Sequence, residues 1–289
     1  MSSRLFLALP LAAVLAAPRA DARGLVVSPT QVGLAGKPGT SVAGTIVVGS
    51  SRTESNQVRV TLLDFSRDED GRIVERPLGG EPRSCREWLA ADRTEFTSPE
   101  TGRVEVRVTA RIPANASGSY WALAALESLP PKPKLGMGMA IQMVPRVVVP
   151  IVVTVSGTER RLVKIGGVRA TKSGDGVDAV CEIENTGNTA VLVSGAFTLE
   201  RATGSGPAEE VAEAPVTAVT SLPGLKLRIR KSLAFPMPGA AYTVRAILRY
   251  GPDPADVTES VSTIEGEAPP AAGDRLAPPA PTHPPGGGS

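Results

Sequence analysis

The feature that most constrains the fold is the regular interruption of the chain by glycine and proline. The 289 residues include 30 glycines and 27 prolines. Short runs rich in Val, Ile, Thr and Leu lie between them and alternate with polar residues, as in 44–48, 57–62 and 104–108. A period of two is typical of strands with one face on a core and one face in water. Many short strands at even spacing predict an all-β protein built as a sandwich or barrel.

The composition argues against several classes of function. Lys and Arg number 31 against 29 Asp and Glu, so there is no strong field to attract nucleic acid. The single histidine, His283, lies in a stretch rich in Pro and Gly, which argues against His-ligated zinc and Ser-His-Asp triads. Asp64, Asp68 and Glu69 fall at strand ends and turns, where nothing pairs them as a glycosidase requires. We therefore expect no enzyme, no metal and no cofactor.

Residues 1–22 have the features of a secretory signal peptide. A basic start precedes an apolar run, and Ala20-Asp21-Ala22 supplies the small residues that favour cleavage before Arg23. The alternative, a membrane anchor, is disfavoured because the run contains Pro10 and is shorter than the ~20 residues that span a bilayer. We expect a periplasmic protein without a membrane span, with the cell surface or secretion from the cell as the alternatives.

The rest of the chain divides into two domains and a tail. We expect an immunoglobulin-like sandwich over 23–156, a second over 157–266, and a disordered Pro/Gly-rich tail over 267–289. In the first domain, 68–71 is predicted as a hairpin turn between 58–65 and 72–75. A calcium loop is the less favoured alternative, because the spaced ligands of such a loop are missing. The segment 129–138 is predicted as a long loop.

Further strands and turns are expected from the same patterns. Residues 120–126 are predicted to form a fully buried central strand, and 184–188 a turn whose Asn and Gly tolerate left-handed backbone. In the second domain the predicted strands are 177–183, 191–199, 225–229, 242–249 and 257–264. Cys85 and Cys181 are predicted to be free thiols, although export to an oxidising compartment leaves a disulfide open.

Several short motifs together are similar to those of a known family. They are Val26-Val27-Ser28-Pro29-Thr30 followed by Pro38-Gly39, then Trp88-Leu89, Tyr120-Trp121, and the turn 184–188. With them the chain resembles the PapD-like periplasmic pilus-assembly chaperones. The opening motif also resembles secreted Gram-positive surface proteins with related sandwiches. The first resemblance implies a boomerang of two immunoglobulin-like domains, monomeric, that lends the last strand of its first domain to an exported β-sandwich subunit.

The segment 141–155 would be that lent strand. Its odd positions are apolar throughout, and its even positions are mixed but rich in valine. This pattern suits a donor strand and equally suits a strand buried inside a sandwich. Pro145 and Pro150 differ in parity, so they cannot both face a free edge unless a bulge intervenes.

The resemblance also implies a basic pair that holds the carboxylate at the end of the subunit. By alignment the first position is Gln31, which has no charge, and the second is Arg146. Partner contacts are expected from Ile141, Met143, Val147 and Val149. Two functions remain open: a chaperone that binds exported subunits by strand addition, and a structural or adhesive surface module that packs against other envelope proteins.

Overall fold

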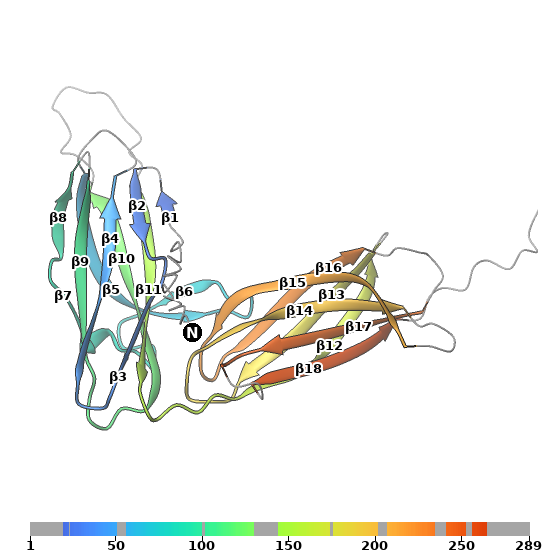
Figure 1. Ribbon diagram of the computed structural model, residues 1–289. Coiled ribbons are helices and arrows are strands. Elements are labelled where there is room, and N and C mark those ends of the chain that lie inside the picture. Colours follow the sequence, from blue (N-terminus) through green and yellow to red (C-terminus); the bar gives the residue numbers. More distant parts are fainter. Residues whose placement is uncertain are drawn as a thin grey trace, which may run out of the picture.

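The computed structural model describes residues 20–22, 24–50, 56–99, 102–129, 144–173, 176–201, 207–234, 241–252 and 256–264. It confirms an all-β fold of two immunoglobulin-like sandwiches, set at an angle to one another and joined at one end (Figure 1). Ile141, Met143, most of the expected leader, nearly all of the loop 129–138 and the expected tail lie outside the described residues. No helix in the described part of the chain is long and apolar enough to cross a membrane.

The first sandwich consists of two sheets. One has the strand order β1-β2-β4-β9-β7, and the other β3-β11-β10-β5, extended by β6 and by β8, which pairs with β5. The strands are β1 (Ala20–Ala22), β2 (Leu25–Ser28), β3 (Val32–Gly36), β4 (Ser41–Gly49), β5 (Asn56–Arg67), β6 (Ile73–Arg76), β7 (Leu89–Ala91), β8 (Glu95–Ser98), β9 (Arg103–Arg111), β10 (Gly118–Leu129) and β11 (Arg146–Val155). A 3-10 turn, η1 (Arg86–Trp88), precedes β7.

The segment 26–34 of this domain is divided between the two sheets. The sequence predicts one strand near 26–34, but β2 pairs with β4 while β3 pairs in parallel with β11. The chain changes sheet at Pro29, which has no N–H to contribute to a ladder. On this side one sheet therefore ends with β2 and β1, and the other ends with β3. The core between the sheets is made of alternating residues such as Val27, Ile46, Val108 and Leu126, all fully buried.

The predicted hairpin around residues 68–71 is present, and it forms an arm. β5 pairs with β10 only as far as Leu63, and from Asp64 it pairs with β6 instead. Beyond that point Trp121 of β10 donates to the Arg83 carbonyl and accepts from the Cys85 N–H, at 2.9 and 3.1 Å. Released from the sheet, the β5–β6 arm reaches toward β15 and β16 of the second sandwich (Figure 1).

The second sandwich packs a three-stranded sheet, β12-β13-β16, against a four-stranded sheet, β15-β14-β17-β18. The strands are β12 (Val163–Ser173), β13 (Gly176–Asn185), β14 (Val191–Arg201), β15 (Glu209–Ser221), β16 (Lys226–Ala234), β17 (Tyr242–Arg249) and β18 (Val257–Ile264). The five strands expected from sequence are all present, whereas β12 and β15 were not predicted. The core includes Ile183, Phe197, Leu199 and Leu248.

The two cysteines are separate, as predicted. Cys85 and Cys181 are both buried and free, one in the core of each sandwich. Burial raises the pKa of both thiols, that of Cys181 to about 12. The thiols therefore stay protonated and inert in the folded protein.

Candidate functional site

The candidate site is the outer edge of β11. One edge of this strand pairs with β10 along its whole length, from Arg146 opposite Glu127 to Val155 opposite Gly118. The other edge pairs with β3 only from Ile151 to Val155. Within the described residues, no strand pairs with the stretch from Arg146 to Pro150. An unpaired strand edge is a template for another strand.

The ladder shows which backbone groups point along this edge. The Ser128 N–H donates to the Pro145 carbonyl at 3.0 Å, so the pair 128–145 is a hydrogen-bonded pair of the antiparallel ladder. Hydrogen-bonded and non-bonded pairs alternate, so Arg146 and Val148 direct their N–H and C=O groups away from β10. Pro150 has the same parity and contributes no N–H, just before β3 begins. The two prolines therefore face opposite edges, as the sequence indicated, and no bulge interrupts the β10–β11 register.

The odd-numbered side chains of β11 face the core of the first sandwich. Val149, Ile151, Val153 and Val155 are fully buried there, and Val147 keeps 6% of its surface exposed. Two predicted partner contacts, Val147 and Val149, thus lie inside the protein in this structure. A partner could reach the backbone of this strand but not these side chains.

The even-numbered side chains face the junction between the domains. Val148 and Val152 belong to a separate apolar cluster on the outer face of the sheet. This junction cluster also contains residues of the arm and of the second domain; its buried members are Phe65, Trp121, Leu123, Val152 and Leu222. The Trp121 indole N–H donates to the Phe65 carbonyl at 2.9 Å. β11 is therefore apolar on both faces because the second domain and the arm cover the second face.

Arg146 is held by two acidic side chains of its own domain. Its guanidinium forms a bidentate pair with Glu75 of β6, one bond of 3.1 Å, and its Nε lies 2.6 Å from a carboxylate oxygen of Glu127 on β10. Hydrogen bonding to Glu75 raises the pKa of Arg146 further. The side chain thus ties the arm to the top of β11.

Gln31 lies apart from Arg146. It precedes Val32, which is opposite Ile151, so Gln31 is level with Pro150. At about 3.3 Å per residue, that is roughly 13 Å along the strand from Arg146. The Gln31 amide oxygen is 3.2 Å from the Thr220 hydroxyl of β15 in the second domain. The structure therefore does not bring the two residues expected to form the anchor into one site.

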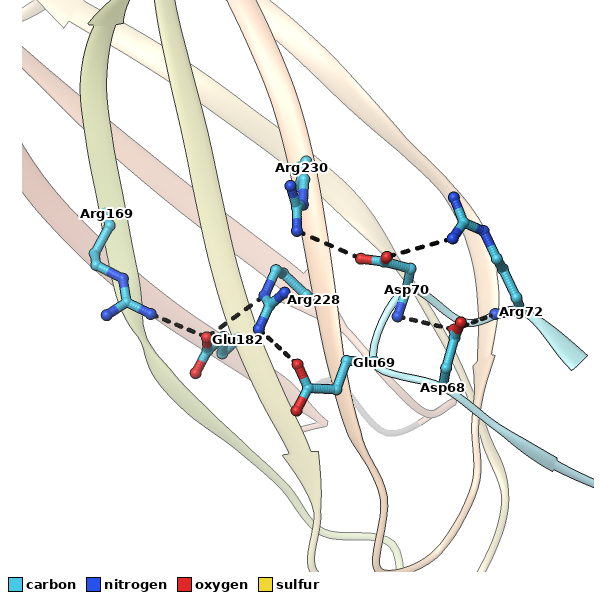
Figure 2. Close-up of polar contacts among 8 residues, drawn as sticks. All are labelled: Asp68, Glu69, Asp70, Arg72, Arg169, Glu182, Arg228 and Arg230. Atoms are coloured by element: carbon cyan, nitrogen blue, oxygen red, sulfur yellow. Dashed lines mark hydrogen bonds and ion pairs between the residues drawn. The ribbon is translucent and has the colours of Figure 1, made fainter. Parts of the chain in front are cut away.

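The tip of the arm is bound to the second domain (Figure 2). The Arg228 N–H of β16 donates to the Glu69 carbonyl at 2.6 Å, and the Arg228 guanidinium pairs with the Glu69 carboxylate, also at 2.6 Å. Arg230 lies 3.6 Å from Asp70, and Arg228 also lies 3.6 Å from Glu182. The acidic turn, predicted only as a hairpin turn, thus also binds two arginines of the second domain.

The tip is shaped by its own polar groups. The Asp68 carboxylate accepts the Asp70 and Arg72 N–H groups at 3.0 and 2.8 Å. Gly71 has a φ of +79°, and a Cβ there would lie 3.1 Å from Leu227 of the second domain. Glycine therefore provides both the left-handed turn and the close approach to β16.

A second set of bonds joins the domains where the chain passes between them. The Asn188 carbonyl accepts the Ser119 N–H at 2.8 Å and the Arg83 guanidinium at 3.3 Å. A Cβ on Gly118 would lie 2.1 Å from that carbonyl, so the contact requires glycine. The predicted turn 184–188 is present, and its Asn185 amide is buried and donates to the Thr189 and Ser221 carbonyls.

The residues considered for catalysis or metal binding have structural roles. Asp64 is fully buried, and its carboxylate accepts the Gly79 N–H and the Ser84 hydroxyl, both at 2.6 Å. It fixes the loop that carries Arg83 to the junction. The described residues include no group of three or more His, Cys, Asp or Glu side chains that could hold a metal ion.

Sequence reasoning missed the importance of Val148, Leu222 and the arm. Pro150 was the available signal for Val148. Proline is confined to strand edges that are not paired, and the backbone of Val148, two residues earlier, faces the same edge as that of Pro150. Leu222 lies in an unremarkable Ser-Leu-Pro-Gly stretch, and nothing in that stretch points to a residue of the other domain.

Comparison with known proteins gives likenesses of fold. No protein-family model matches the chain, and no curated protein matches its sequence. Among solved structures, the class 5 fimbriae chaperone CfaA is 10% identical with a TM-score of 0.44, over 82% of this chain and 98% of that one.

Two more solved structures are similar to the chain. The E. coli chaperone DraB is 15% identical with a TM-score of 0.37, over 84% and 97% of the two chains. A chain of the CsuC–CsuE chaperone–tip adhesion subunit complex of Acinetobacter baumannii is 7% identical with a TM-score of 0.44, over 82% and 97%.

Proposed function

We propose that the protein is an exported, non-enzymatic chaperone that binds another envelope protein by strand addition at the free edge of β11. The expected donor segment, 141–155, narrows in this proposal to Arg146–Val149. The observation that carries it is the outward-facing backbone of Arg146 and Val148, which no strand in the described part of the chain pairs, beside a fully formed ladder with β10. Strand addition supplies main-chain hydrogen bonds to a partner that lacks a strand of its own.

The surroundings of this edge suit such a role. β11 is pinned by β10, by β3 and by the junction cluster, so its backbone is held extended before a partner arrives. Binding then costs little ordering of the chain itself. Val144, just before β11, is 49% exposed and continues the same edge upward.

A backbone variant tests the proposal directly. Val148→Pro removes an N–H from the free edge while leaving the β10 ladder intact, as Pro150 already does two residues later. The matched control, Val148→Thr, keeps the N–H and nearly the same shape. Tagged protein starting at Arg23 is used to capture partners from envelope extract, with folding checked by circular dichroism.

We expect wild type and Val148→Thr to capture an exported β-rich protein and folded Val148→Pro to lose it. Equal capture by all three, or no exported β-rich partner, would remove the β11 edge from the function. Cross-linked peptides that map to residues 144–150 would identify the contact independently.

The surface-module alternative has one observation in its favour. Both apolar faces of β11 are covered within the chain, by the core and by the junction cluster, so its sequence needs no partner to explain it. Fractionation of cells separates the two functions: a chaperone is released with the periplasm, whereas a surface module stays with the envelope.

A further inference from the structure

The edge of the first sheet is formed by residues of the expected leader. β1 pairs antiparallel with β2, with Ala20 opposite Val27 and Ala22 opposite Leu25. Figure 1 shows β1 at the margin of the first sandwich, beside β2. The expected cleavage before Arg23 falls between these two strands, so it removes β1 and leaves β2 in place. The structure therefore describes a strand that the exported chain lacks.

Pairing with β1 satisfies one side of β2. Only two residues separate Ala22 from Leu25, and the second, Gly24, has a φ of +114°, a sign common in two-residue hairpin loops. The residues that flank such a loop form a hydrogen-bonded pair, and bonded pairs alternate, so Leu25 and Val27 direct their N–H and C=O groups toward β1. Ser28 directs its groups toward β4. Removal of β1 therefore leaves β2 with an unpaired edge.

β1 also lies close to the candidate site. Cα atoms of β1 and β11 come within 8 Å of each other, less than the roughly 10 Å between stacked sheets. β2 precedes β3 in the chain, and β3 pairs with β11 from Ile151 onward, so β1 and β2 lie beside the earlier part of β11, which β3 does not pair. A strand added to β11 would lie about 4.8 Å from it. β1 and an added strand therefore compete for the gap between β2 and β11.

A tethered segment competes well even when its own pairing is weak. A segment joined through a short linker has an effective concentration in the millimolar range. β1 is three residues long and is joined to β2 through only two residues. A partner at micromolar concentration must therefore displace β1 before it can add to β11.

We infer that residues 20–22 are an internal competitor that covers the gap between β2 and β11 until a signal peptidase hydrolyses the Ala22–Arg23 bond. The inference rests on the proposed function and on the expected cleavage, and it adds a regulatory step: the chain gains its binding surface when it is processed. The processed chain then presents two neighbouring edges, β2 and the stretch Arg146–Val149 of β11.

Hydrogen exchange tests the covering of β2 without any partner. A form starting at Pro18 (the Pro18 form) keeps every residue that the structure describes, and a form starting at Arg23 (the Arg23 form) lacks β1. We expect the Leu25 and Val27 amides to exchange at least about tenfold faster in the Arg23 form, and the Ser28 amide, which faces β4, to change by less than about twofold. Equal rates at Leu25 and Val27 in the two forms would overturn the inference, whatever the partner is.

Binding of a peptide tests the competition. The probe is a fluorescein-labelled peptide of alternating Thr and Val flanked by Lys, and fluorescence polarisation gives its Kd. The matched control is the Pro18 form with Ala20→Pro and Ala22→Pro, which keeps the added residues but removes the N–H groups that pair with β2. We expect the Pro18 form to bind at least about tenfold more weakly than the Arg23 form, and the proline variant to bind within about twofold of the Arg23 form.

The outcomes separate the inference from the proposed function. Equal Kd values for the Pro18 and Arg23 forms would overturn the inference and leave strand addition standing. A proline variant that binds as weakly as the Pro18 form would also overturn it, because the weakening would then not come from the pairing of β1. Failure of the Arg23 form to bind, or undiminished binding by Val148→Pro in that form, would overturn the proposed function itself.

Discussion

Val147 and Val148 are neighbours on β11 that serve different parts of the molecule. Val147 faces the core of the first sandwich, and Val148 faces the junction cluster and directs its backbone to the free edge. An apolar-rich segment alone does not separate these roles. The odd or even position of a residue along the strand does separate them. A single hydrogen bond, that from the Ser128 N–H to the Pro145 carbonyl, shows which of the two sets bonds to β10.

Val147→Arg is expected to destabilise the first domain. The guanidinium would be buried among Val, Leu and Ile side chains without a partner, at a cost of at least about 3 kcal/mol in the free energy of unfolding. Urea denaturation measures this loss, and Val148→Thr serves as the conservative control, with a loss below about 1 kcal/mol. A folded Val147→Arg protein of wild-type stability would contradict the placement of this side chain.

The cysteines predict a loss of stability at alkaline pH. The folded pKa of Cys181 is raised to about 12 from an ordinary value of 9.0, so the folded state holds this proton more tightly than the unfolded state does. Its contribution is full below about pH 9 and declines as the pH rises from there toward 12, by up to about 1.4 kcal/mol per pH unit. The difference in unfolding free energy between wild type and Cys181→Ala should therefore shrink by roughly 1.4 kcal/mol from pH 8 to pH 10. A difference that does not change with pH would show that the thiol is not buried.

At the scale of elements, the arm and β15 show which features sequence patterns do not predict. The hairpin around residues 68–71 was predicted correctly, but its docking on β16 joins Glu69 to Arg228, far along the chain. β15 was missed because Glu209, Glu210, Glu213 and Pro215 suggest a polar loop, and only its pairing with β14 makes it a strand. Alternation of apolar and polar residues predicts strands that have one face in solvent. Whether other segments form strands depends on their tertiary contacts.

The arm tip offers a charge-swap experiment. Arg228→Glu and Glu69→Arg should each destabilise the protein, and the double variant should recover part of the loss because the ion pair is restored with reversed polarity. Both side chains are partly exposed, so the coupling energy is expected to be only about 0.5–1 kcal/mol and to fall with added salt. A double-mutant cycle in urea measures it. Additive losses with no coupling would mean that the backbone bond between Arg228 and Glu69 alone holds the tip.

At the scale of the whole molecule, the contacts at the junction determine whether the two sandwiches unfold together or separately. The arm tip, the junction cluster, the Asn188 contacts and the Gln31–Thr220 contact join the domains at separate points. Two consecutive sandwiches could be predicted from composition and spacing, but this junction could not, since Arg83 and Asn188 stand 105 residues apart. The same holds for the candidate site. The strand itself was predicted from sequence, but its free edge was not, because that edge depends on where β3 begins to pair with β11.

We therefore expect the domains to unfold together. Leu222 is 1% exposed and packs from the second domain against the first, so Leu222→Ala should remove about 2–5 kcal/mol and uncouple the two sandwiches. Scanning calorimetry should show one transition for wild type and two for Leu222→Ala. Leu199→Ala is the matched control: Leu199 is fully buried inside the second sandwich, so its loss should lower the transition without splitting it. Two transitions already in wild type would show that the domains move independently, and the position of Thr220 beside Gln31 would then not be fixed before a partner binds.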